Sequence, residues 1–172
     1  MIEAWACINL IRGISEAGKL GLVGGRLRCA YAFNRATFSA LYSSMGTILD
    51  SDDGVHSLPR MMKRLTSFWA TNSELLTLIK GVESAIAADH TTEKLKAWRN
   101  KAIAHRTPKA IDIEFYAENQ ASVEEIACTL TLLEDQLNVL SVNFDGVISH
   151  GLQGAARVIP SEVVEIFGAG NR

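Results

Sequence analysis

Hydrophobic residues along this chain recur at steps of three and four, the spacing that places them on one face of an α-helix. The longest series predicts a helix over about residues 122–147, introduced by Ser122 and Glu125 at the positions of an N-terminal capping box. A stripe that continues over about seven helical turns is typical of the packing seam of a helical bundle. Its members are Val123, Ile126, Leu130, Leu133, Leu137, Leu140, Phe144 and Val147.

Shorter series of the same kind predict the other helices, while alternating runs typical of β-strands are scarce. The predicted fold class is therefore all-α. Because the pattern shows neither an internal repeat nor a domain boundary, the chain is expected to form one domain. The predicted helices cover about 2–17, 26–49, the stretch from Pro59, 74–89 with Ser73 as its cap, the stretch from Thr91 or Thr92 to before Pro108, and a short helix from Ser161.

The segments between these helices carry turn-forming residues. The glycines of 18–25 predict a flexible connector, residues 50–54 a solvated turn, and residues 108–120 a loop or one short extended piece. In the second helix Asn34 interrupts an apolar face, either as a core residue satisfied by a neighbour or as a polar group beside a site. The apolar members of that face are Leu27, Tyr31, Phe38, Leu41, Met45 and Ile48.

The composition fits a cytoplasmic protein that holds no metal and contacts no membrane. Hydrophobic residues make up 48% of the chain and the mean hydropathy is +0.11, but no apolar run approaches the roughly 18 residues of a membrane span. The N-terminus lacks the basic start of a signal peptide. The far-apart Cys7, Cys29 and Cys128 complete no zinc spacing with the histidines and are expected to be reduced, buried thiols.

The one concentration of titratable chemistry lies around Trp98–Arg106. The formal net charge of −2 argues against nucleic-acid binding over the whole surface. Yet more than a third of the 17 Lys and Arg residues fall between 94 and 109, a window that contains no acidic residue. The basic residues of this window are Lys94, Lys96, Arg99, Lys101, Arg106 and Lys109.

This window contains the groups that cleave RNA without a metal. His105 suits proton transfer near neutral pH, since an unperturbed imidazole has a pKa of about 6.5. Arg99 suits the phosphate in the transition state because its planar fork donates to two oxygens, and Asn100 can add a donor or orient the arginine. The flanking cations would hold neighbouring phosphates. These are Lys96, Lys101, Arg106 and Lys109. A purely structural reading is equally supported: the helix dipole favours cations in a last turn, and His105 could cap it.

The spacing of Arg99 and His105 constrains any joint site. On a straight helix of about 3.6 residues per turn, side chains six positions apart point about 120° away from each other. The pair can meet if the helix unwinds at His105, if the length of the arginine closes the gap, or if two chains pool their pairs in one cleft.

The run Arg99-Asn100-Lys101-Ala102-Ile103-Ala104-His105 resembles the Arg-x(4–6)-His signature of the HEPN superfamily, in particular its abortive-infection branch. The stretch from Asn34 to Asp50, followed by Ser57–Arg60, is similar to the same branch. The resemblance implies a single HEPN-like domain over 1–172. It would be an up-and-down bundle of four to five main helices, with a core of about 26–147 on which the N-terminal helix and the C-terminal tail dock.

The resemblance further implies a homodimer that cleaves RNA without metal or cofactor, as a toxin or antiviral effector, with a protein antitoxin as a further expected partner. Arg99 and His105 become the catalytic pair, supported by Asn100. Thr107 departs from two patterns at that position: some HEPN toxins have a modifiable Tyr there, and the abortive-infection branch often has an acidic residue. The alternative function is a non-catalytic helical module that dimerises and binds RNA or a nucleotide. Since the cysteines stand at apolar positions and no Gly-x-Ser-x-Gly occurs, a Cys or Ser hydrolase is disfavoured.

Overall fold

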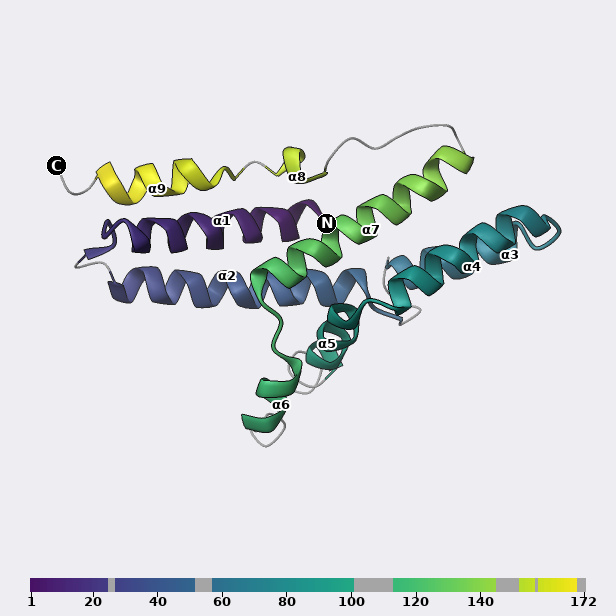
Figure 1. Cartoon of the computed structure of the whole chain (residues 1–172), viewed down its shortest axis with the longest axis horizontal. Coiled ribbons are helices and arrows are strands. Elements are labelled where there is room, and N and C mark those ends of the chain that lie inside the picture. Colours follow the sequence, from purple (N-terminus) through teal and green to yellow (C-terminus); the bar gives the residue numbers. More distant parts are fainter. Residues whose placement is uncertain (25–26, 52–56, 101–112, 145–151, 157, 170–172) are drawn as a thin grey trace. The chain divides into compact units, whose positions relative to one another are not determined.

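The structure is a computed structural model that describes residues 1–24, 27–51, 57–100, 113–144, 152–156 and 158–169. The elements in these ranges are helices, and none of the described residues is in a strand (Figure 1), so the all-α prediction is confirmed. The helices are α1 Ile2–Lys19, α2 Leu27–Ile48, α3 Leu58–Phe68, α4 Ser73–Ala87, α5 His90–Trp98, α6 Ile113–Asn119, α7 Val123–Phe144, α8 Leu152–Ala155 and α9 Pro160–Ala169.

The contacts divide the chain into two compact units. One comprises residues 1–44 and 151–172, and the other comprises residues 45–150. The single domain over 1–172 stays a prediction, and each unit is described by itself.

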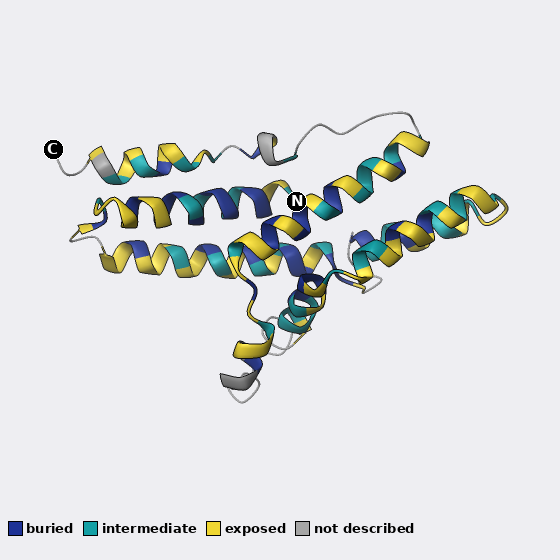
Figure 2. Cartoon of the chain, viewed as in Figure 1, coloured by how far each residue is buried: buried dark blue, intermediate teal, exposed yellow. Residues whose placement is uncertain are grey.

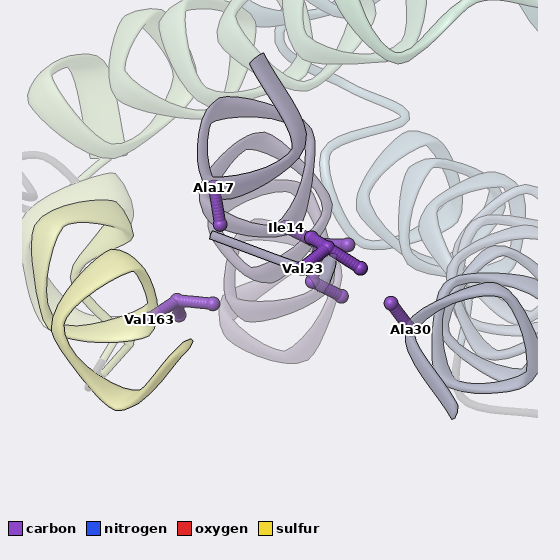
Figure 3. Packing of buried hydrophobic residues seen from close by; sticks show 5 residues of the cluster. All are labelled: Ile14, Ala17, Val23, Ala30 and Val163. Carbon is purple, nitrogen blue, oxygen red and sulfur yellow. The ribbon is translucent and has the colours of Figure 1, made fainter. Parts of the chain in front are cut away.

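In the first unit the C-terminal helix packs along the N-terminal one. Helix α1 contacts both α8 and α9, and Asn9 Nδ2 donates a hydrogen bond to the carbonyl oxygen of Val158 at 2.9 Å. Figure 3 shows Val163 of α9 pointing toward α1, on whose other side Ile14 lies beside Val23. Val23 is 6% exposed, so the glycine-rich stretch expected to be a flexible connector contributes to this core.

The predicted face of α2 is buried over only part of its length (Figure 2). Leu41 and Met45 are fully buried, as the periodicity predicts, but Leu27 and Tyr31 are about 70% exposed. Asn34 Oδ1 is buried and finds no hydrogen-bond partner among the described residues, so this oxygen is not satisfied by a neighbour as the simpler reading expects.

In the second unit α7 supplies the core seam. It packs on α4 and α5, and α4 also contacts α3. Both hydrogen bonds of the predicted capping box are present: the Ser122 N–H donates to Glu125 Oε2 at 2.6 Å, and the Glu125 N–H donates to Ser122 Oγ at 3.1 Å. These bonds, with the ammonium of Lys94, lower the pKa of Glu125 to about 2. The seam is confirmed by the buried members Ile126, Leu130, Leu133 and Leu140, while Val147 lies outside the described residues.

The caps of α4 and α5 lie upstream of the residues predicted to form them. Asn72, not Ser73, caps α4 and accepts from the N–H groups of Glu74 and Leu75 at 3.1 Å. Asp89, not a threonine, caps α5. Its Oδ2 accepts from Thr92 N at 2.7 Å, from Thr92 Oγ1 at 2.8 Å and from Thr129 Oγ1 at 2.9 Å. One carboxylate oxygen therefore both starts α5 and ties it to α7.

Two further expectations are wrong. Residues 113–119 form helix α6 instead of a loop or extended piece. Phe115 of this helix is buried, and its ring centroid lies 5.8 Å from that of Trp98, so packing onto α5 stabilises a short segment with little helical signal of its own. Cys29 and Cys128 are exposed and only Cys7 is partly buried, which raises the pKa of its thiol.

Gly13 provides a test of the packing between α1 and α9. A Cβ at this position would lie 2.5 Å from Val163 Cβ and 2.8 Å from the carbonyl oxygen of Pro160. We expect Gly13→Ala to lower the free energy of unfolding by about 1–3 kcal/mol, as overpacking does. The measurement is chemical denaturation followed by circular dichroism.

Gly18→Ala is the matched control, because an added Cβ meets nothing within 4 Å there and the position is also in α1. Removing a helical glycine should leave stability unchanged or raise it by up to about 1 kcal/mol. If the two variants unfolded alike, the close approach of α9 to α1 would be contradicted.

Candidate functional site

Helix α5 carries the described part of the basic window and is anchored along its length. Asp89 holds its first turn, Leu95 is fully buried, and the ring of Trp98 packs against that of Phe115 at a tilt of 59°. Lys94 Nζ reaches Glu125 Oε1 of α7 at 3.1 Å with its side chain only 16% exposed. Lys94 is therefore engaged in packing, and Arg99 stands at the end of a helix that is fixed to its neighbours.

The backbone changes at Arg99. Regular α-helix ends at Trp98, and Arg99 and Asn100 continue it as a wider turn of π-helix. Such turns are rare and occur frequently at functional sites. The angle of about 120° between Arg99 and His105 assumes a straight α-helix, and Arg99 and Asn100 already depart from that geometry. His105 itself lies outside the described residues.

The guanidinium of Arg99 is held by two side chains. Its Nη2 donates to Asp50 Oδ2 in an ion pair, and its Nη1 donates to Asn100 Oδ1 at 3.2 Å. The Asp50 side chain is 4% exposed and that of Arg99 is 23% exposed. The pair is thus largely shielded from solvent, where an ion pair is screened less and the loss of one partner costs more than at the surface.

Asp50 is the residue of this site that the sequence reading missed. It was expected in a solvated turn, and that expectation is wrong. The helix dipole offers a signal that could have identified it: a carboxylate just beyond a helix C-terminus is unfavourable unless a cation compensates it. Asp50 follows α2 in that way, and a cationic window without acidic residues begins 44 positions onward, at Lys94.

A cavity of about 150 Å³ opens beside the ion pair, and all of its lining residues belong to the unit 45–150. This volume has room for a phosphate-sized anion or a few water molecules. Three of the predicted site residues, Lys96, Arg99 and Asn100, meet in its wall. The remaining lining residues are Gly46, Leu49, Asp50 and Ser51.

For most of the other predicted site residues, the described ranges give no position. His105, the second member of the catalytic pair, and the predicted phosphate contacts Lys101, Arg106 and Lys109 all lie outside the described ranges. Lys96 forms a surface ion pair with Glu93 at 3.0 Å. A pair exposed to this degree is weak, so Lys96 can exchange its partner for an anion in the cavity.

An arginine that is fixed in this way is suited to binding an anion. A guanidinium that is oriented by two oxygens can present its remaining N–H groups to a phosphate in one direction. In the part of the chain that the structure describes, no three His, Cys, Asp or Glu side chains gather to hold a metal ion. None of the described helices is long and apolar enough to cross a membrane.

Among the comparisons with known proteins, the match is to a family model. The model HEPN_AbiU2, described as AbiU2, matches residues 5–154, which is most of the chain. The match includes both Asp50 and the run from Arg99 to His105. Comparison with the curated proteins and with the solved structures finds no match.

The ion pair between Arg99 and Asp50 is expected to contribute to the stability of the fold. Arg99→Ala would leave the buried carboxylate of Asp50 without this partner, and we expect a loss of about 1–3 kcal/mol in the free energy of unfolding. Adding Asp50→Asn to Arg99→Ala should recover part of that loss, since no buried charge then remains. A double-mutant cycle measured by urea denaturation gives the coupling. Strictly additive effects of the two substitutions would contradict a direct pair.

Proposed function

The chain belongs to the AbiU2 family of HEPN domains, and on that premise we propose that it is a metal-independent endoribonuclease. It acts as a toxin or antiviral effector of the abortive-infection type, through a composite Arg/His site at a homodimer interface. The observation that carries the proposal is the fixed guanidinium of Arg99 in the wall of a cavity that it shares with Lys96 and Asn100.

In the proposed reaction the ribose 2′-hydroxyl attacks the adjacent phosphorus and the bond to the 5′-oxygen breaks. His105 takes the proton from the 2′-hydroxyl, or gives one to the leaving 5′-oxygen, and two such histidines can divide these roles. Arg99 donates to the non-bridging oxygens, whose negative charge grows in the transition state. Asn100 keeps the guanidinium plane turned toward the phosphate, as its 3.2 Å contact with Arg99 supports.

The remaining cations of the window are proposed to hold the RNA on either side of the cleaved bond. Lys96 lines the cavity already, and Lys101, Arg106 and Lys109 follow Asn100 closely in sequence. Each phosphate that these residues neutralise releases counterions, so RNA affinity should fall steeply as salt rises.

The homodimer brings two Arg/His pairs into one cleft, so that one chain can supply the arginine and the other the histidine for a single cut. A nuclease that attacks the RNA of its own cell needs restraint, so a protein antitoxin that covers the cleft is the proposed further partner. A site that no antitoxin covers would damage the host continuously.

Cleavage of single-stranded RNA by the purified protein in the presence of EDTA tests the proposal. We expect cleavage that survives chelation, leaves 2′,3′-cyclic phosphate ends, and falls by at least about 100-fold in both Arg99→Ala and His105→Ala. The products are resolved by gel electrophoresis and their ends identified by mass spectrometry.

His90→Ala is the matched control, since His90 is an exposed histidine in the first turn of α5, and its loss should leave the rate unchanged. Full activity in His105→Ala would contradict the proposal. Salt-sensitive RNA binding without any cleavage would instead support the non-catalytic RNA-binding module.

A further inference from the structure

Asp50 occupies a position that helix stability does not explain. It follows the last turn of α2, where the partial negative charge of the helix C-terminus opposes a carboxylate. Its side chain is nevertheless 4% exposed, so it has also lost most of the hydration that would stabilise its charge. Because Asp50 destabilises its own helix end, its place has to be explained by an interaction outside that helix.

Arg99, the partner of Asp50 in the ion pair, provides this explanation. Arg99 stands at the C-terminal end of α5, where a cation is favoured with or without Asp50. A free arginine side chain has about 2 kcal/mol of rotamer entropy, so the dipole alone leaves the guanidinium mobile. The bonds from Nη2 to Asp50 and from Nη1 to Asn100 engage both terminal nitrogens and fix the plane of the guanidinium.

We infer that Asp50 is a positioning residue that holds Arg99 in its reactive orientation, an inference that rests on the proposed ribonuclease function. The anchor comes from the end of α2, 49 positions away in sequence, so the arginine is fixed to a second helix and not only to its own backbone. Asn100, the other holder, is exposed and adjacent in sequence. It can follow any movement of the turn, whereas the buried Asp50 cannot.

Asp50→Asn tests this inference with two readouts on the dimer. The substitution keeps the shape of the side chain and removes its charge. In single-turnover cleavage at saturating RNA we expect the rate to fall about 10- to 100-fold, the effect of a misplaced catalytic group, with little change in the RNA concentration at half-saturation. The protein should remain folded by circular dichroism.

The second readout is the ¹⁵N NMR spectrum of the arginine side chains, in which Arg99→Lys identifies the Arg99 signals. A guanidinium held by Asp50 gives separate, slowly averaging Nη signals in the wild type, and these should merge in Asp50→Asn. This readout needs no RNA and reports the orientation of Arg99 whether or not the protein cleaves.

Asp135→Asn is the matched control, because the same substitution at an exposed carboxylate of α7 changes the net charge equally. It should move neither readout. Unchanged Arg99 signals in Asp50→Asn would overturn the inference, and so would merged signals together with an undiminished rate. A wild type that cleaves no RNA would overturn the proposed function and the catalytic role of Asp50, while the NMR signals would still decide whether Asp50 holds Arg99.

Should Asp50→Asn fail to fold, Asp50→Glu carries the test. It keeps the charge but displaces the carboxylate by one methylene group, so the Arg99 signals should shift and the rate should fall by less than 10-fold. Wild-type signals and rate in this variant would overturn the inference.

Discussion

The buried ion pair between Asp50 and Arg99 is the interaction on which the candidate site depends. It joins the end of α2 to the end of α5. Both helix ends carry a partial negative charge, so without Arg99 the carboxylate of Asp50 would be uncompensated there. Arginine satisfies this position because it stays charged when desolvated and donates in a fixed fork. The cavity forms where these two helix ends meet, so its shape and its charge both depend on the pair.

The surroundings of α5 explain why Arg99 has a defined place at all. A helix of nine residues is too short to be stable in water by itself. Here Asp89 ties its first turn to Thr129 of α7, and Phe115 of α6 packs against Trp98 in its last turn. Packing of the helix therefore determines where the guanidinium lies, and the two oxygens of Asp50 and Asn100 determine which way it faces.

The parts of the fold that could be predicted from sequence are those with a local physical signal. The seam of α7 and the Ser122–Glu125 capping box follow from periodicity and from residues three positions apart, and both are present. The caps of α4 and α5 were predicted at the wrong residues, because several neighbouring polar residues can each cap a helix. The observed caps are Asn72 and Asp89. The bond from Thr129 to Asp89, which favours Asp89 over the threonines that follow it, is tertiary and has no local pattern.

The residues of the candidate site also differ in whether the sequence could predict them. Residue chemistry alone singled out Lys96, Arg99 and Asn100, and the structure brings these three into one cavity wall. It did not point to Asp50, because a carboxylate among other acids of a turn has the pattern of a solvated loop. The available signal was the place of Asp50 just beyond the end of a helix. Helix α6 was missed since its stability depends on Phe115 meeting Trp98, a contact between residues whose pairing no local pattern encodes.

The central claim, one site assembled from two chains, is tested most directly by mixing two inactive variants. Arg99→Ala and His105→Ala homodimers are each expected to lack cleavage. After subunits are exchanged, a mixed dimer contains one intact arginine and one intact histidine on different chains, and the account predicts that metal-independent cleavage returns in part. A mixture in which subunit exchange is demonstrated, but which stays as inactive as either variant alone, would contradict it.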